Sequence, residues 1–394
     1  MLRAFAQRWV LLFSLLFGLT VPLRYHVLPS PGAALRPWLE TAGQALAGRP
    51  VALFSDSAGL YSYAAALLLL TALVAGIWAT QARRTAAAEA RLWYVLHTGA
   101  AWLLALQLLE YGFDKVFKHQ FYLPEPNTLY TPLGLLPPDL AYWSVMGASH
   151  WYSIFAGLLE VLPALLLLWG RTRLVGGILA LAVLANVLAL NISFDISVKL
   201  WSAFLLLLAA VVAAPGLQIA YYALVRDYWR PARPMRPAQW YGRWVGAVRG
   251  LGLGILLLET AGPFVFDQRF NDDRMPRPPL HGAYAVSSLA RSSAAAAPCL
   301  AARKVPLRLF VHRQGYLITQ AADGQMTSYH LTYAPGQLLL RDEAGRTSRL
   351  RYTTSTGGLR LAGTLGPDSV RWLARPLPWR RLPLLQGWRW VASY

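Results

Sequence analysis

Residues 151–170 read WYSIFAGLLEVLPALLLLWG, an apolar run in which Glu160 is the only charged residue. The run has about the 20 residues that a helix needs to cross a bilayer. A charged residue at the centre of a membrane helix costs about 2.5 to 3.5 kcal/mol on insertion scales, so it usually faces a bundle interior or a wet cavity. Glu160 is therefore the first candidate for a functional residue.

Apolar runs of similar length recur along the chain and predict about seven membrane helices. They cover residues 9–23, 59–80, 92–113, 151–170, 174–192, 199–222 and 244–264. The composition, 56% hydrophobic and 14% charged, agrees with membrane helices joined to a soluble part. The first run can also be read as a secretory signal peptide, but no small-residue cleavage site follows it cleanly, which favours a retained helix.

The segments between these runs differ in Lys and Arg content, and the difference predicts an orientation. One set of alternate segments holds Arg3, Arg8, Arg83, Arg84, Arg91, Arg171, Arg173, Arg226, Arg230, Arg233, Arg236 and Arg243. The other set holds Arg24, Arg36, Arg49, Lys115, Lys118 and Lys199. Because cytoplasmic loops carry the excess of Lys and Arg, we expect a multi-pass protein of the inner membrane with a cytoplasmic N-terminus and an extracytoplasmic C-terminal domain.

The hydropathy pattern of the sequence changes near Val305, where short strand-like runs separated by turn residues replace the long apolar runs. The predicted strands are 306–311, 316–321, 327–333, 337–341, 348–353, 359–362 and 369–373. Alternation of this kind, with turns every 8–12 residues, indicates a small antiparallel β sandwich or barrel. We expect Trp379, Trp388 and Trp390 to close its core.

These patterns predict a membrane all-α helical bundle followed by a β domain. The predicted parts are two N-terminal helices with an outer loop (1–91), a four-helix membrane core (92–225), a basic cytoplasmic loop with the seventh helix (226–266), a tether with little structure (267–304) and an extracytoplasmic β domain (305–394). Residues 114–150, between the first and second helices of the core, read as a long insertion.

Several function classes are disfavoured. The formal net charge of +19 suggests nucleic acid, but many arginines lie in short loops beside apolar runs, and the strands lack the aromatic-basic motifs of nucleic-acid binders. Cys299 is the only cysteine, so the chain has no intramolecular disulfide and no Cys-x-x-Cys pair. His119 and His150 stand apart from other ligand types, so no metal site is expected.

A sparse set of polar residues interrupts the predicted four-helix core. Its members are Glu110, Asp114, Lys115, Glu160, Asn186, Asn191, Asp195 and Lys199. With the predicted orientation, all of them fall in the extracytoplasmic half of the bundle. Glu160 lies about 13 Å along its helix from Trp151, at 1.5 Å per residue.

Two interpretations of this set remain open. The residues could form a polar pocket that opens outward and binds a quinone head group, a small anion or a lipid head group. They could instead hold the helices in register through a buried pair of Glu160 with a lysine and through Asn hydrogen bonds. Lys115 and Lys199 are the candidate partners, because both lie near outer helix ends.

Two motifs resemble the DoxX family of membrane proteins. The segment Phe155-Ala-Gly-Leu-Leu-Glu160, continuing to Gly170-Arg-Thr, resembles the second core helix of that family, and Glu110-Tyr-Gly-Phe-Asp114-Lys115 resembles the end of the first. The resemblance covers about residues 92–222 and implies a four-helix membrane bundle. The whole layout is similar to a longer DoxX-like group from Bacteroidetes, in which His281-Gly-Ala-Tyr would enter the β domain. The group's Ser-Gly-Asp segment is altered here to Ser55-Asp56-Ser57.

The resemblance implies an envelope protein that acts with partners, since the family includes thiosulfate:quinone oxidoreductase subunits and many members without assigned activity. We expect a DoxX-like integral membrane protein of the bacterial envelope with an outward-facing polar pocket, whose β domain docks a protein partner or a polymer. One alternative is a quinone-linked membrane oxidoreductase subunit with Glu160 as the proton-handling group. Another is a lipid or small-molecule carrier. The single cysteine disfavours a stand-alone thiol oxidoreductase.

Overall fold

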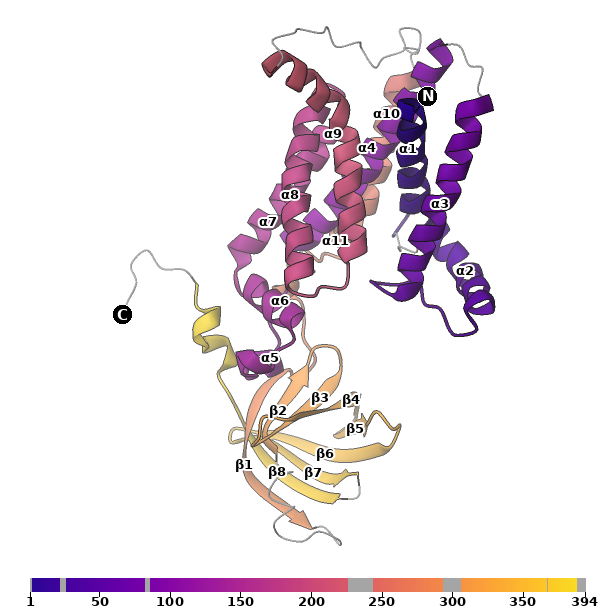
Figure 1. Cartoon of the computed structure of the whole chain (residues 1–394). Helices are drawn as coiled ribbons and strands as arrows, with labels where there is room; N and C mark the ends of the chain where they lie inside the picture. Colours follow the sequence, from indigo (N-terminus) through magenta and orange to yellow (C-terminus); the bar gives the residue numbers. More distant parts are fainter. Residues whose placement is uncertain are drawn as a thin grey trace. The chain divides into compact units, whose positions relative to one another are not determined.

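The computed structural model describes residues 2–21, 26–81, 86–225, 244–292, 306–366 and 368–387. The chain divides into two compact units (Figure 1). The helical unit comprises Met1–Gln120 and Trp151–Asn271, and the barrel unit comprises Phe121–His150 and Asp272–Tyr394. Several residues used above lie outside the described part: Arg24, Arg83, Arg84, Arg226, Arg230, Arg233, Arg236, Arg243, Cys299, Trp388 and Trp390.

Helices make up almost all of the helical unit, as the hydropathy pattern predicts. In chain order they are α1 (Leu2–Thr20), α2 (Pro31–Ala47), α3 (Ala58–Gln81), α4 (Ala86–Val116), α7 (His150–Leu167), α8 (Arg173–Ser193), α9 (Lys199–Leu224), α10 (Trp244–Thr260) and α11 (Gly262–Phe266). Within the described residues, five helices are long and apolar enough to cross a membrane: α3, α4, α7, α8 and α9. The apolar part of α1 and the 17-residue α10 are shorter.

Small residues let neighbouring helices approach closely. A Cβ atom placed on Gly177 of α8 would lie 3.0 Å from the Cβ of Ala213 on α9.

The outward faces of the helices are strongly apolar: Leu69, Leu73 and Ile77 of α3 are exposed. An apolar outer surface of this kind suits contact with lipid rather than with water.

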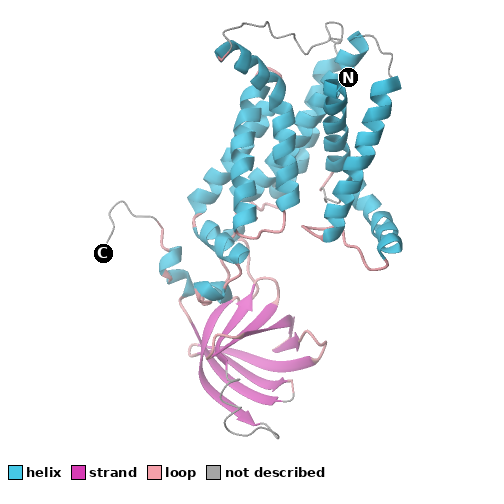
Figure 2. Ribbon diagram, viewed as in Figure 1, coloured by secondary structure: helices cyan, strands magenta, loops and turns pink. Residues whose placement is uncertain are grey.

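The strands form one closed antiparallel barrel in which each strand pairs with the next (Figure 2). They are β1 (Gly282–Ser292), β2 (Pro306–His312), β3 (Tyr316–Ala321), β4 (Met326–Ala334), β5 (Gln337–Arg341), β6 (Thr347–Ser355), β7 (Gly358–Leu365) and β8 (Asp368–Pro376). Alternate residues point inward and form a core of mainly Leu, Val and Trp372. The barrel, rather than the sandwich, is therefore the architecture of the β domain.

The barrel begins earlier than the sequence indicates. β1 lies inside the segment expected to be an unstructured tether, and it closes the barrel by pairing with both β2 and β8. The predicted strands from residue 306 onward agree with β2 to β8 to within a few residues at each end.

The insertion after α4 belongs to the barrel unit. It contains α5 (Pro126–Leu129), the 3₁₀ turn η1 (Leu133–Leu135) and α6 (Pro138–Ala148). The Tyr130 ring packs against Phe310 of β2 at a tilt, with ring centroids 5.8 Å apart, and the Tyr130 carbonyl accepts a hydrogen bond from Gln320. Phe310 and Trp379 are buried in one cluster outside the barrel, so β2 is covered on both faces.

Candidate functional site

The core of the predicted site is the crossing of α4 and α7. At this point Gly112 meets Gly157 so closely that a Cβ on Gly157 would lie 2.5 Å from the Gly112 carbonyl oxygen. About one turn further along each helix, Lys115 Nζ lies 2.7 Å from Glu160 Oε2. Their side chains are 9% and 5% exposed, respectively. The glycines thus bring the helices close enough for a direct, buried ion pair.

Further hydrogen bonds tie the same crossing together. Lys115 Nζ also donates to the Tyr111 carbonyl at 3.3 Å, and the Ser153 hydroxyl donates to the Lys115 carbonyl at 2.7 Å. A buried pair with satisfied hydrogen bonds fixes helix register, and loss of one partner leaves an uncompensated charge. The pairing of Glu160 with a lysine, which the sequence suggested, is present with Lys115.

A second polar cluster lies where α9 begins. Lys199 Nζ lies 2.7 Å from Asp195 Oδ1 and 3.7 Å from Asp56 Oδ2. The Asp56 carboxylate also accepts hydrogen bonds from the backbone N–H groups of Lys199 and Leu200, at 2.8 and 3.0 Å. It therefore satisfies N–H groups that the first turn of a helix leaves free, and its negative charge suits that end of the helix dipole. Asp195 is 81% exposed.

A small cavity of about 120 Å³ adjoins this second cluster. It is lined by Val21, Leu53, Phe54, Ser55, Asp56, Leu60, Tyr111, Val198 and Trp201. The eight residues of the predicted pocket are not among these lining residues. Tyr111 connects the cavity to the first cluster, because its carbonyl accepts the Lys115 hydrogen bond.

The other predicted residues do not gather around one point. Glu110 accepts a long hydrogen bond from Gln107, at 3.4 Å, and Asp114 is half-buried at the end of α4. Asn191 is buried near the end of α8, whereas Asn186 is exposed on that helix. The structure thus forms the pairs Lys115–Glu160 and Asp195–Lys199 and distributes the remaining residues over two helices.

Glu259 on α10 is a buried polar residue that the sequence reading did not single out. Its carboxylate accepts hydrogen bonds from the backbone N–H groups of His26, Val27 and Leu28, the last two at 2.8 and 2.6 Å. It thereby holds the segment after α1 against α10. The local sequence offers no signal for this contact, because more than 230 residues separate the partners.

A larger cavity of about 940 Å³ lies between α1, α3, α4 and α9. Its walls are mainly apolar and include Trp78, Trp93 and Val211. Its polar lining residues are Gln7, Arg8, Glu89 and Gln218. Arg8 forms an ion pair with Glu89 and lies 5.0 Å from the centre of the Trp78 ring.

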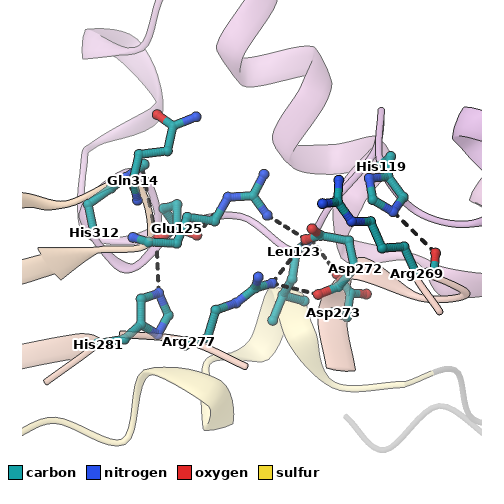
Figure 3. Close-up of polar contacts among 11 residues, drawn as sticks. His119, Leu123, Glu125, Arg269, Asp272, Asp273, Arg277, His281, His312 and Gln314 are labelled. Atoms are coloured by element: carbon teal, nitrogen blue, oxygen red, sulfur yellow. Dashed lines mark hydrogen bonds and ion pairs between the residues drawn. The ribbon is translucent and has the colours of Figure 1, made fainter. Parts of the chain in front are cut away.

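The barrel unit contains its own buried charge network (Figure 3). Glu125, in the insertion, has a side chain only 5% exposed. Its Oε2 atom lies 2.9 Å from His281 Nε2 and 4.0 Å from His312 Nε2. The Arg313 backbone N–H donates to the same carboxylate, and the Arg313 guanidinium also forms an ion pair with Asp272.

This environment shifts the pKa values of two groups. Burial alone would raise the pKa of the Glu125 carboxyl, but the His281 hydrogen bond, the two histidine charges and the Arg313 N–H together lower it below its ordinary value. Burial lowers the pKa of His312, despite the nearby Glu125. The network therefore favours an ionised Glu125, which joins the insertion to the start of the barrel. Within the described residues, no group of three or more His, Cys, Asp or Glu side chains is placed to hold a metal ion.

Comparison with known proteins adds one short similarity. The chain is 34% identical over 70 residues to the uncharacterized protein YwoB of Bacillus subtilis (strain 168). The match covers 18% of this chain and 46% of that protein, so the chain spans about half the length of the relative it matches. No family model matches the chain. No solved structure matches it either.

Proposed function

We propose that this chain is a DoxX-like integral membrane protein of the bacterial envelope that holds an extracytoplasmic β-barrel domain for docking a partner. The observation that carries the proposal is the combination, in one chain, of five helices fit to cross a bilayer with a closed barrel. The Lys and Arg asymmetry of the loops supports the cytoplasmic side for the N-terminus.

In this proposal α1 and α10 are the remaining two of seven spans. Their packing supports the role. α1 packs against α3 and α4, and its Phe17 is fully buried. On α10, a Cβ at Gly252 would lie 2.9 Å from the ring of Trp102 on α4. Both helices therefore lie directly against helices long enough to span.

The polar residues of the helical unit take two roles in this proposal. The Lys115–Glu160 pair locks the α4–α7 crossing, which the hydrogen-bonded burial of both groups supports. The Asp195–Lys199 pair at the start of α9 is the polar part of the proposed outward-facing pocket, and the small cavity that adjoins it is lined mainly by apolar residues together with Ser55 and Asp56.

Docking through the barrel is tested by site-specific photo-crosslinking in intact cells. A photoreactive residue replaces exposed Thr353 or Thr364 on the barrel, and exposed Arg171, between α7 and α8, serves as the control. We expect discrete adducts from the two barrel positions and none of the same mass from position 171. Absence of adducts from the barrel, or identical adducts from all three positions, would contradict docking through this domain.

A second candidate function is binding of an amphiphile, a quinone or a lipid, in the cavity of about 940 Å³. Mainly apolar walls with a few polar groups are typical of sites for ligands of this kind. Ala214 lines this cavity, so Ala214→Phe fills part of it, while Ala185→Phe on the exposed face of α8 is a matched control. Mass spectrometry of molecules that co-purify in mild detergent would show a species lost from the first variant and kept in the second. Identical co-purified species in both variants would rule out this cavity as the site.

A further inference from the structure

One half of the barrel wall carries an unusual concentration of positive charge. The alternation of β5 to β8 turns six arginines outward, and all six are exposed: Arg341, Arg349, Arg351, Arg360, Arg371 and Arg375. We call these six residues the basic face. The inward positions between them are leucines, Val370 and Trp372, so the outward direction follows from the burial of their neighbours.

Strand register brings these arginines close together. Arg351 on β6 and Arg371 on β8 both lie opposite Ala362 of the intervening β7. Neighbouring strands are about 4.8 Å apart, so the backbones of these two arginines are roughly 10 Å apart with only a methyl group between them. Arg349 and Arg351 alternate on one strand at a spacing of about 7 Å.

Within the described part of the chain, no acidic side chain neutralises the positive charges of the basic face. None of its six guanidinium groups forms a hydrogen bond, an ion pair or a ring contact with a described residue. Other arginines of the same unit do so: Arg308 bonds Gln320, Arg313 pairs with Asp272, and Arg346 pairs with Asp342. Like charges on adjacent strands destabilise a sheet, and a face that serves solubility alone is better made of mixed charges.

The residues around the arginines indicate the kind of anion. The other outward positions of β6 and β7 are small or hydroxylated, such as Thr353, Ala362 and Thr364, and no outward residue of β5 to β8 is aromatic. Protein interfaces are usually anchored by aromatic and apolar side chains in their centres. The outward leucines of these strands, Leu339 and Leu373, each lie opposite an arginine, Arg349 and Arg360, and no aromatic side chain joins them. A surface dominated by guanidinium groups suits repeated contacts with phosphate groups, which arginine binds through paired hydrogen bonds.

The curvature of the basic face favours a flexible polymer over a flat membrane as its ligand. The basic face extends over four of the eight strands of a closed barrel, which is half of its circumference. A flat bilayer touches such a convex wall along only one or two strands at a time. A flexible chain can follow the curvature and contact all six arginines. We propose that the basic face binds a linear, phosphate-bearing polymer of the envelope. This proposal rests on the proposed function, because it names the partner class that the barrel docks.

The test measures binding of fluorescently labelled linear inorganic polyphosphate to the full-length protein in nanodiscs of zwitterionic lipid. The variant R351Q/R360Q/R371Q removes three charges from the basic face. The control R346Q/R380Q/R381Q removes three exposed arginines of the same unit outside it. We expect about 100-fold weaker binding for the first variant, with the slope of log K against log salt reduced by about 2. We expect the control to change binding by less than about threefold.

Equal losses in both variants, or no loss in the first, would overturn the proposal. Two further probes complete the assay: vesicles containing phosphatidylglycerol and soluble polyglutamate. Tighter binding of the wild-type protein to the vesicles would identify a membrane surface instead, and tighter binding to polyglutamate would identify an acidic protein. Because this binding is measured on purified protein, it does not depend on which side of the membrane the barrel occupies. Failure here is therefore distinguishable from failure of the proposed location.

Discussion

At the scale of single residues, the Lys115–Glu160 pair decides how α4 and α7 meet. Glu160→Gln leaves the Lys115 ammonium buried without its counter-charge, so we expect a loss of about 3 to 5 kcal/mol of stability. Thermal unfolding of the purified protein in detergent, followed by size-exclusion chromatography, measures the effect.

The double variant Lys115→Met/Glu160→Met is the control for this prediction. It removes both charges and fills the space with apolar groups, so we expect it to be more stable than Glu160→Gln. If Glu160→Gln unfolds at the wild-type temperature, the pair does not hold the crossing.

The Glu125 network predicts how the barrel unit responds to acid. The pKa of Glu125 is lowered in the folded protein, so its contribution to stability is present above its unfolded pKa and is lost as pH falls through the folded value. The pKa of His312 is also lowered, so below its unfolded value the unfolded chain binds more protons and stability falls further. The lowered pKa values of both groups therefore predict that the barrel is more stable at neutral than at acidic pH.

The variant for this second prediction is Glu125→Gln. We expect it to be less stable at neutral pH and to show a smaller further loss between about pH 6 and pH 3, as followed by intrinsic fluorescence. Glu343→Gln, at an exposed carboxylate of the same unit, should keep the wild-type pH profile. A Glu125→Gln profile parallel to that of the wild type would show that this carboxylate is not the group that titrates.

At this scale, the sequence predicts only those site residues that a local pattern identifies. Glu160 stood out because a single charge in an apolar run has a known cost. Lys115 and Lys199 were both candidate partners, because both lie near outer helix ends, and the structure pairs Glu160 with Lys115. Glu125 did not stand out, because its partner His281 is 156 residues away and both lie in short loops without periodicity. Asp56 was noted only as an altered motif, and its capping of α9 depends on a contact 143 residues away.

At the scale of elements, β1 is the strand of the barrel that the sequence pattern did not predict. Its residues, GAYAVSSLARS, are small and only weakly alternating, and they precede an Ala-rich segment. β2 to β8 were recognisable because each pairs with the next through a short turn. β1 pairs with β8, from Tyr284 opposite Pro376 to Ser292 opposite Ser369, and no local pattern encodes contacts so far apart in the chain.

This pairing predicts how fragments of the barrel behave. A fragment of residues 300–394 lacks β1, so it leaves β2 and β8 as open edges, which favour aggregation. We expect that fragment to be insoluble or unfolded by circular dichroism. A fragment of residues 272–394 keeps the closed barrel and should give a β spectrum with cooperative unfolding. A 300–394 fragment as soluble and as cooperative as the longer one would mean that β1 is dispensable.

At the scale of the whole molecule, the proposed function joins a membrane bundle to a barrel outside the cytoplasm. The orientation rests on loop charges, and many of those arginines lie outside the described residues. The helices themselves followed directly from apolar runs, because length and hydropathy are local properties. Orientation depends on the membrane and on insertion, so it requires a direct measurement in cells.

The single cysteine provides that measurement. Cys299 lies between β1 and β2 in the chain, so a thiol label reports on one position in the barrel unit. The account predicts that a membrane-impermeant maleimide labels Cys299 in intact cells whose outer barrier is permeable to the reagent. In a C299S background, Arg171→Cys should be labelled only after the inner membrane is opened, and denaturation in detergent should expose both thiols as a control. Labelling of Cys299 only after the inner membrane is opened would place the barrel in the cytoplasm and contradict the proposed orientation.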